Sequence, residues 1–381
     1  MIDGRTNSLT RLLSLYLSAP RIRKVEVPRV SLSYQRPAYA EYNVSKVALL
    51  IENRPYSFLA PLMLHFISVV PPDWRFRFMG SEESVASINQ SVAIRHQVDI
   101  GKLDLTYIPP NMSVASTEYI SRFLTNLWLY ETVLQPAEWL LVFQSDSILC
   151  ANSRQNLDDF LEYDWVGAPW NPSGRFGGNG GLSLRRVSPI VEILREQVRV
   201  DGGAPEDVWL TDRLGDRLGA KMANGSVSLQ FSGEMNQGVS EAIVKEGSGS
   251  EILAAYNNTL AAAAAGEWVE GIDDWRDGHY EPLGYHMGAS GTNMHAGIWG
   301  TPEKRKHIWK YCPEVKMTLG MDAAKYIPGD CRPNWKRDEG GDGEGEGDNG
   351  RGALDSRDFG YGTEVIDGVE YPMLPPNLMP W

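Results

Sequence analysis

Cysteine is scarce in this chain. The 381 residues include only three, Cys150, Cys312 and Cys331, and no two of them stand close together. This number and spacing exclude a disulfide-rich scaffold and a cysteine-based zinc site. Two readings remain open: one disulfide with one free cysteine, or three reduced cysteines.

Long apolar runs are also missing. No stretch reaches the roughly 18 to 20 apolar residues that a membrane span requires. Residues 8–24 are apolar with interspersed basic residues and no acidic one. We therefore expect residues 1–43 to form an N-terminal extension, which is either a targeting segment or anchor stump, or a surface helix that leads into the domain. Membrane association is expected only through such an anchor.

Glycosylation sequons favour a secretory location. The motif Asn-X-Ser/Thr begins at Asn43, Asn89, Asn111, Asn224 and Asn257, and it marks surface positions in secreted proteins. We expect the secretory pathway, in the Golgi lumen, with the cytoplasm as the alternative.

A basic excess is absent as well. The formal net charge is −13, whereas a nucleic-acid-binding protein needs a concentrated basic surface. Nucleic acid is therefore excluded as a partner. Residues 338–348 alternate Gly with Asp and Glu and contain almost nothing apolar, which predicts a disordered acidic linker and tail over residues 329–381.

Strand-like and helix-like runs alternate from Val44 onward. This alternation predicts an α/β domain over residues 44–328, with a mostly parallel central sheet flanked by helices. The predicted strands are residues 46–51, 74–79, 103–108, 139–143 and 182–186, and the segments with helical spacing are 55–70, 114–134 and 187–197.

A carboxylate follows the predicted strand 139–143. Ligands of parallel sheets bind beyond the carboxyl ends of the strands, and the polar residues Gln144, Ser145 and Asp146 come there. Asp146 offers the oxygen ligand that a hard cation prefers. The alternative is an ordinary turn or helix cap.

Two further segments carry candidate chemistry. Residues 177–181 read Gly-Gly-Asn-Gly-Gly directly before a predicted strand, and such glycines let a backbone approach a ligand closely; an ordinary turn is the alternative. Pro205, Glu206 and Asp207 form a good helix start, and one of the two carboxylates is a candidate general base. His286, late in the chain, is a candidate metal ligand or a satisfied polar residue.

Taken in order, four motifs resemble those of an uncharacterised glycosyltransferase-like family found in fungi and bacteria. They are FQSDS at 143–147, DWVGAPW at 164–170, GNGGLSLR at 178–185 and PEDV at 205–208. The resemblance spans about residues 44–332. It implies a single GT-A-type domain that transfers a sugar from a nucleotide-diphosphate donor to a hydroxyl acceptor.

The resemblance also implies residue roles. A divalent metal, Mn²⁺ or Mg²⁺, would be held by Asp146 and His286, and Asp207 would be the base with Glu206 as neighbour or substitute. The glycine loop would shape the sugar pocket through Gly178, Asn179, Gly180 and Gly181. One departure matters, because Gln144 stands where the family scheme has the first acid of Asp-X-Asp. Metal affinity is then expected to be weak, with diphosphate oxygens supplying most ligands, and metal independence stays open.

Other residues are expected near the donor. Glu52, Asn53 and Arg54 follow the first strand, Arg122 lies on the helix before the Asp146 strand, and Ser145 belongs to the same strand end. The arginines suit a diphosphate, although a surface salt bridge is the alternative for Arg54. Trp165 and Trp170 can stack on a sugar or fill the core as large apolar residues.

The expected reaction is an inverting displacement, with a UDP-sugar as the favoured donor and a glycan, protein or small molecule as acceptor. A different class is a catalytically inactive carbohydrate- or nucleotide-sugar-binding protein on the same fold, which Gln144 favours. A sugar nucleotidyltransferase would need a basic glycine-rich phosphate loop, and residues 50–56 do not provide one.

Overall fold

The structure of the protein is a computed structural model that describes residues 42–238, 273–320, 363–366 and 369–372. These residues belong to a unit that spans Glu41–Trp381. The predicted N-terminal extension therefore lies almost wholly outside the described residues, and most of the predicted acidic tail does too. A two-stranded antiparallel hairpin is described within that tail, β10 (Thr363–Ile366) and β11 (Val369–Pro372).

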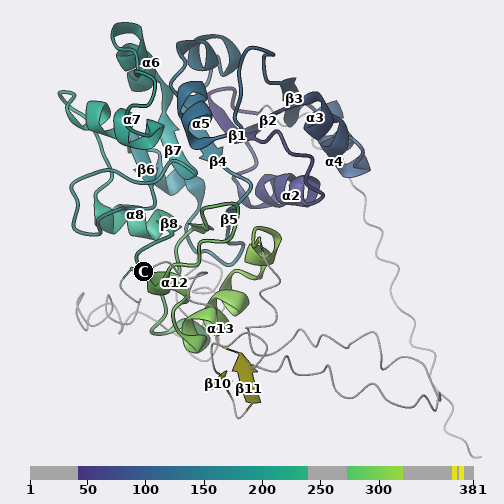
Figure 1. Ribbon diagram of the computed structural model, residues 1–381, viewed down its shortest axis with the longest axis vertical. Coiled ribbons are helices and arrows are strands. Elements are labelled where there is room, and N and C mark those ends of the chain that lie inside the picture. Colours follow the sequence, from purple (N-terminus) through teal and green to yellow (C-terminus); the bar gives the residue numbers. More distant parts are fainter. Residues whose placement is uncertain (1–41, 239–272, 321–362, 367–368, 373–381) are drawn as a thin grey trace, which may run out of the picture. The chain divides into compact units, whose positions relative to one another are not determined.

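A six-stranded mixed sheet forms the centre of the domain, in the order β3-β2-β1-β4-β7-β6 (Figure 1). The first four of these strands are parallel to one another, whereas β7 is antiparallel to both of its neighbours. The predicted α/β class with a mostly parallel, helix-flanked sheet is confirmed. The strands are β1 (Lys46–Ile51), β2 (Arg75–Gly80), β3 (Leu103–Tyr107), β4 (Trp139–Phe143), β6 (Trp165–Gly167) and β7 (Leu182–Arg186).

Strand β1 shows why these runs become central strands. Successive side chains of a strand point to opposite faces, and here both faces are covered. Ala48 and Leu50 pack into one buried cluster, and Val47 and Leu49 pack into a second one. Because complete burial of such an apolar side chain contributes about 1.5 to 3 kcal/mol, a continuous apolar run is stable only between two layers of helices.

Helices of the two clusters come from different parts of the chain. The first cluster contains residues of α2, α3 and α4, and the second contains residues of α5, α6 and α7. Their bounds are α2 (Leu59–Val69), α3 (Glu82–Ile88), α4 (Val92–Asp99), α5 (Thr117–Leu124), α6 (Val187–Glu196), α7 (Glu206–Gly215) and α8 (Gly225–Phe231).

The segment predicted as one amphipathic helix over 114–134 is two elements. Helix α5 is followed by a short π-helical segment, η1 (Leu129–Val133). The Thr125 hydroxyl donates to the Ser121 carbonyl, and the Asn126 side chain accepts from the Trp128 N–H at 3.0 Å. Side chains of this type offer the backbone an alternative to continued helix, so the prediction of one helix was wrong.

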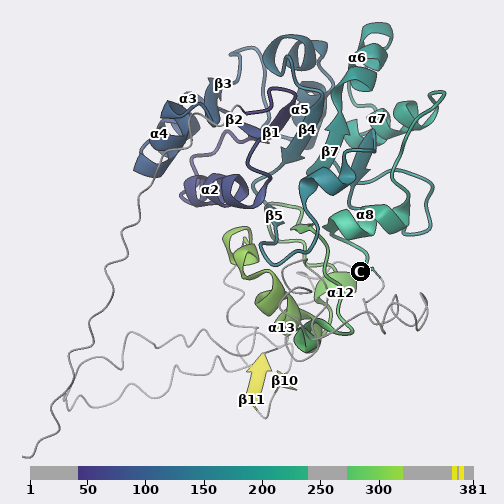
Figure 2. The same ribbon diagram turned by 180° about the vertical axis from the view of Figure 1, so that it is seen from behind.

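A smaller region lies beside the main sheet (Figures 1 and 2). It is built on a three-stranded sheet in the order β5-β9-β8, where β5 follows directly after Asp146. Its elements are β5 (Ser147–Leu149), η2 (Leu157–Phe160), β8 (Ser232–Gly233), η3 (Asp274–Arg276), β9 (Gly284–His286), α12 (Ala296–Trp299), α13 (Pro302–Tyr311) and η4 (Pro313–Met317).

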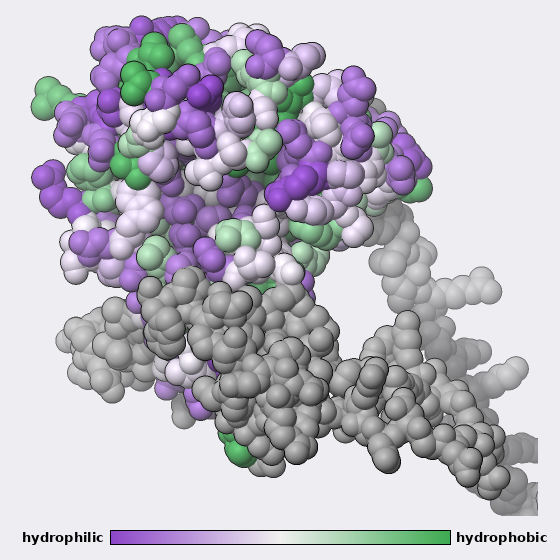
Figure 3. Space-filling view, in the orientation of Figure 1, coloured by the Kyte–Doolittle hydropathy of each residue, from purple (hydrophilic) through white to green (hydrophobic). Residues whose placement is uncertain are grey.

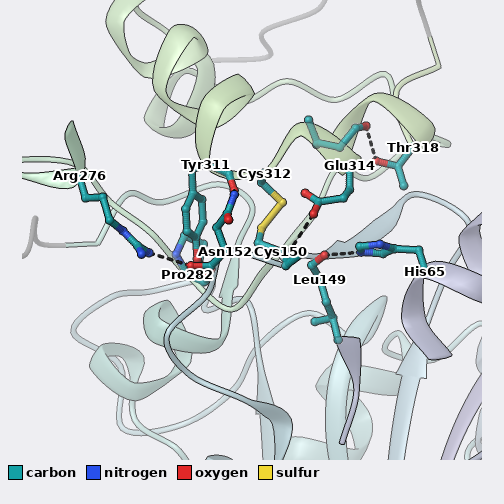
Figure 4. Close-up of a disulfide and its surroundings, with 12 residues drawn as sticks. His65, Leu149, Cys150, Asn152, Arg276, Pro282, Tyr311, Cys312, Glu314 and Thr318 are labelled. Carbon is teal, nitrogen blue, oxygen red and sulfur yellow. Dashed lines mark hydrogen bonds between the residues drawn. A yellow bond between two sulfur atoms is a disulfide. The ribbon is translucent and has the colours of Figure 1, made fainter. Parts of the chain in front are cut away.

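A disulfide joins Cys150, just after β5, to Cys312 at the end of α13, with the Cα atoms 4.9 Å apart (Figure 4). Of the two readings that the sequence left open, the structure has the pair. Cys331 lies outside the described residues. Around the bond, the Asn152 amide donates to the Tyr311 carbonyl at 2.8 Å, and the Ala151 N–H donates to Glu314 at 3.2 Å.

On the face shown in Figure 3, hydrophobic residues appear as small separate groups among hydrophilic ones. Within the described part of the chain, no helix combines the length and apolar character needed to cross a bilayer.

Candidate active site

A pocket of about 210 Å³ opens at the carboxyl ends of β1 and β4, and we call it the edge pocket. Phe143, the last residue of β4, stacks on Phe66 of α2 with 3.8 Å between ring centroids, which anchors the strand end. The edge pocket is lined by apolar and by polar residues, which we call its apolar wall and its polar wall. The apolar wall includes Ile51, Val114, Ile120, Phe123, Leu124 and Val142, and the polar wall includes Glu52, Arg54, Gln144, Ser145, Asp146 and Ser290.

Asp146 and His286 meet beside this pocket because β5 and β9 are paired, with Ser147 opposite His286. Asp146 Oδ1 lies 3.5 Å from His286 Nε2, and Glu234 Oε1 lies 3.3 Å from His286 Nδ1. Both carboxylates and the ring are buried, yet neither ring nitrogen has a hydrogen bond of good geometry. The imidazole is thus held between two acids with unmet polar atoms on both sides.

Burial alone would lower the pKa of His286, but the carboxylates of Asp146 and Glu234 outweigh it and raise the pKa to about 10. Burial would raise the pKa of Asp146, whereas His286 and the Ser290 N–H hold it below its usual value. The pair is therefore charged at neutral pH, and a metal ion would bind His286 by displacing its proton.

The residues fit a divalent ion as an incomplete protein site. A cation can satisfy His286 Nε2, which lacks a well-formed hydrogen bond and lies beside the Asp146 carboxylate, and one imidazole with one carboxylate suits Mn²⁺ or Mg²⁺ with other oxygen ligands. Among the described residues no group of three or more metal-ligating side chains occurs. The chain itself would supply Asp146 and His286, and Glu234 would orient the ring through Nδ1.

The glycine loop, residues 177–181, lies between the candidate metal ligand His286 and the two acids at the start of α7, Glu206 and Asp207. A Cβ on Gly181 would collide with the His286 ring and come within 2.8 Å of Gln144 Oε1, and a Cβ on Gly180 would collide with Glu206. The Gly181 carbonyl accepts from the Gln144 N–H at 2.8 Å. The Gly180 N–H donates to Asp207 Oδ2 at 3.0 Å. Residues 180 and 181 are glycine because two sets of side chains approach them from either side.

The two acids at the start of α7 have different surroundings. Asp207 is partly exposed, and its Oδ1 accepts from the Val208 N–H at 2.8 Å while Oδ2 accepts from Gly180. Glu206 is buried and receives both terminal nitrogens of Arg185, at 2.9 and 3.0 Å. Burial raises the pKa of Glu206 to about 6 although the charge of Arg185 opposes the rise. Asp207 is therefore the accessible carboxylate.

A second ion pair frames the polar wall of the edge pocket. Arg54 donates to both oxygens of Glu52, at 2.8 and 2.7 Å, and Ser145 donates to Glu52 Oε2 at 2.9 Å. Arg54 is 51% exposed and also donates to Ser290 Oγ at 3.2 Å. The hydrogen bond with Glu52 raises the pKa of Arg54, so this guanidinium stays a cation at the pocket mouth.

The loop after β9 completes the wall. Gly288, Ala289, Ser290 and Gly291 all have left-handed backbone, with φ of 69°, 45°, 58° and 83°. Non-glycine residues rarely adopt this conformation, and it clusters at functional sites. The Ser290 N–H donates to Asp146 Oδ2 at 2.8 Å, which ties this loop to the candidate metal ligand.

Several predicted residues lie apart from the edge pocket. Arg122 is not part of the pocket lining and pairs with Glu118 and Asp201, at 2.9 and 3.0 Å. Asn53 is not part of the pocket lining. Trp165 is only 1% exposed and stacks against the Arg185 guanidinium at 4.2 Å, so of the two readings that the sequence left open, sugar stacking or the core, it has the core one.

Trp170 keeps the accessibility that a stacking role requires. It is 37% exposed, and a Cβ on Gly177 would come within 2.9 Å of its ring. The Asn236 amide holds this turn by donating to the Pro169 carbonyl at 2.9 Å. Trp170 therefore lies on the glycine-loop side of the site and outside the edge pocket.

Sequence reasoning missed Glu234, Arg185 and Ser290. Glu234 follows the two-residue strand β8, which is too short to register as a strand pattern. Arg185 entered the sequence analysis only as the last residue of the motif GNGGLSLR. Its place in strand β7, among core residues, gives no local sign of a functional role. No local signal marks Ser290, because its role follows from the conformation of the 288–291 loop.

Comparison with known proteins finds one family model that matches part of the chain. Residues 102–246 match a family model described as "Protein of unknown function (DUF5672)". This match covers less than half of the chain and ends before His286. No curated protein matches the chain significantly.

Several solved structures are remotely similar. The mannosyltransferase Ktr4p from S. cerevisiae matches with 11% identity and a TM-score of 0.28, over 40% of this chain and 59% of that one. The bifunctional glycosyltransferase WbbM matches with 10% identity and a TM-score of 0.36, over 75% and 53%. PcManGT from Pyrobaculum calidifontis, solved with GDP-Man and Mn²⁺, matches with 11% identity and a TM-score of 0.30, over 42% and 49%. This chain thus spans about half of each of these proteins.

Proposed function

We propose that this chain is a metal-assisted glycosyltransferase of the GT-A type, which moves a sugar from a nucleotide-diphosphate donor to a hydroxyl acceptor with inversion. The observation that carries the proposal is the position of Gly180 and Gly181. One side of this dipeptide binds Asp207, and the other side packs against His286 and Gln144. A candidate base and a candidate metal site therefore flank one short stretch of backbone.

The edge pocket suits a nucleotide diphosphate. Its apolar wall can cover a base, while Arg54 and Ser290 lie at its polar end. The polar end and the His286 ring beside it hold more acid than base, since Glu52, Asp146 and Glu234 pair with Arg54 and His286. A diphosphate needs added positive charge here, and a divalent ion bound by Asp146 and His286 would supply it and stabilise the leaving group.

Asp207 is suited to accept the proton of the acceptor hydroxyl. Two backbone N–H groups hold its oxygens in place at the start of α7. In the proposed displacement, the acceptor oxygen forms a bond to the anomeric carbon as that carbon's bond to the diphosphate breaks. The hydroxyl proton passes to Asp207, and the bonding electron pair leaves with the diphosphate.

The donor class is tested by thermal unfolding with UDP-, GDP- and CMP-sugars, each with and without Mn²⁺. A ligand at 100 times its Kd stabilises the folded state by about 2.7 kcal/mol, so a true donor raises the Tm. We expect the largest rise with a UDP-sugar plus Mn²⁺. Asp146→Ala should abolish the Mn²⁺-dependent part, whereas Asp99→Ala, at an exposed residue ending α4, should not. Equal donor binding with chelator and with Mn²⁺ would reject the metal role.

Gln144 keeps a second function open, namely a sugar-nucleotide-binding protein without catalysis. Slow hydrolysis of the bound donor in the absence of acceptor distinguishes the two. An enzyme releases nucleoside diphosphate at a measurable rate, and this rate should fall in Asp207→Asn only if the same carboxylate activates water.

A further inference from the structure

A second pocket of about 150 Å³ lies on the smaller sheet, between β9 and the first turn of α13. Tyr285 of β9 lines this second pocket, and its neighbour His286 faces the candidate metal site. Successive side chains of a strand point to opposite faces, so one short strand separates the two sites. The cavity exceeds by about tenfold the 10 to 15 Å³ that a single water requires.

The Tyr285 hydroxyl is the feature that calls for a ligand. The residue is 1% exposed, and its Oη is buried without a hydrogen-bond partner. Two other tyrosines of this region are satisfied, since Tyr280 donates to the Leu229 carbonyl and Tyr311 donates to the Pro282 carbonyl. Buried hydroxyls in native proteins are nearly always paired, so the Tyr285 hydroxyl points to a partner that occupies the cavity.

The remaining polar groups form a rigid wall. His279 stacks on His307 with 3.8 Å between ring centroids and an interplanar angle of 5°. His307 Nε2 lies 2.8 Å from Glu281, and Glu281 pairs with Arg276 at 2.6 Å. This buried chain of contacts keeps the imidazole rings in place, which is the preorganisation that a small polar ligand needs.

The chemistry of the wall selects among ligand classes. Gln237, Glu303 and Lys304 line the pocket together with the two histidines and Tyr285. Both donors and acceptors, and both signs of charge, are present. An apolar ligand would leave the Tyr285 hydroxyl unpaired, and an anion would face Glu303. A metal ion finds no group of three ligating side chains among the described residues. Hydroxyl groups, which donate and accept, satisfy such a wall, and a sugar ring can also lie against the His279 face.

We infer that the second pocket binds one sugar ring and serves as an accessory subsite for a glycan acceptor. Its role as an acceptor subsite rests on the proposed function, whereas sugar binding itself does not. Binding here holds one ring of a longer glycan on the face of β9 opposite the metal site.

The test is saturation-transfer NMR of the full chain with the methyl glycosides of glucose, galactose and mannose at millimolar concentration. We expect signal from at least one of them. Tyr285→Phe removes only the hydroxyl and should reduce that signal at least fivefold, and Gln237→Ala at the exposed rim should also weaken it. Asp146→Ala should leave it unchanged, because the donor site is separate.

Thermal unfolding of the free protein gives an independent readout. Tyr285→Phe should raise the Tm, because it removes an unpaired buried hydroxyl. The matched control is Tyr130→Phe, which removes a satisfied hydroxyl bonded to the Leu124 carbonyl at 2.7 Å and should lower the Tm.

Two results would overturn the inference: no glycoside signal in the wild type, or a signal that Tyr285→Phe leaves unchanged. If Asp146→Ala also abolished that unchanged signal, the sugar would be assigned to the edge pocket and the proposed function would stay intact. If nucleotide sugars failed to bind while the glycosides still bound, the proposed function would be rejected and the sugar site would stand.

Discussion

Glu206 and Asp207 are adjacent acids in one helical turn, yet their side chains have different surroundings. Glu206 is enclosed with Arg185, and breaking such a buried pair typically costs about 3 to 5 kcal/mol. Asp207 stays accessible, with its oxygens held by backbone N–H groups. At the residue scale, Glu206 therefore positions the helix start and Arg185, and Asp207 is left for chemistry.

Asp207→Asn should retain donor binding and lose turnover by about 100- to 10,000-fold, the usual contribution of a general base. The asparagine carbonyl can still accept the Gly180 N–H, so the contact with the glycine loop is kept while the hydrogen bond from the Val208 N–H is lost. Transfer rate and donor Kd are measured separately on the same preparation. Asp212→Asn makes the same chemical change at an exposed site of the same helix and should leave both values unchanged. Full transfer activity in Asp207→Asn would show that another group takes the proton.

At the element scale, the pairing of β2 with β3 buries a lysine. Lys102 directly precedes β3, is 4% exposed, and donates to the carbonyls of Pro72 and Trp74. Burial lowers the pKa of Lys102 to about 8 although Asp73 opposes the change. The rings of Phe76 and Tyr42, at 5.3 and 5.0 Å, surround the ammonium group.

The lowered pKa of Lys102 determines in which direction the free energy of unfolding changes with pH. Between pH 8 and the ordinary lysine value near 10.5, the unfolded chain binds more protons at this residue than the folded one does. Stability therefore rises with pH in that window. From pH 7.5 to 9.5 the wild type should gain about 2 kcal/mol relative to Lys102→Met, at about 1.4 kcal/mol per pKa unit. Urea unfolding of both proteins at the two pH values measures this difference, and parallel pH dependence would contradict it.

At the scale of the whole molecule, the disulfide joins the two halves of the site. Cys150 follows the strand that begins after Asp146, and Cys312 ends α13. Beyond α13, Gly320 donates to the Gly291 carbonyl at 2.9 Å, so the same segment supports the 288–291 loop. The bond thus holds the chain that carries His286 and Ser290 against the chain that carries Asp146.

Removing this bond should destabilise the fold and loosen the edge pocket. The two cysteines are 162 residues apart, and closure of a loop of that size contributes about 2 to 5 kcal/mol. The Cys150→Ala/Cys312→Ala double variant should lower the Tm by on the order of 10 °C and weaken donor binding. Reductant should shift the wild type toward the variant and leave the variant unaffected. An unchanged Tm in the double variant would show that the bond contributes nothing.

Local sequence patterns predicted the central strands of the sheet and the position of Asp146 after one of them. The runs KVALLI and WLLVF had to be central strands because apolar side chains on both faces need two covering layers, and the structure confirms both. The position of Asp146 at a strand end followed from the same pattern. These features depend only on residues that lie close together in the sequence, so the sequence by itself predicts them.

Only the tertiary structure decided which distant residues share a site. The pairing of β5 with β9 brought His286 to Asp146, and burial beside Arg185 separated Glu206 from Asp207. Arg122 and Trp165 had suitable chemistry but turned toward an acidic partner and the core. These outcomes depend on the packing of segments more than 100 residues apart in some cases, and no local pattern encodes which side chain ends buried and which stays free.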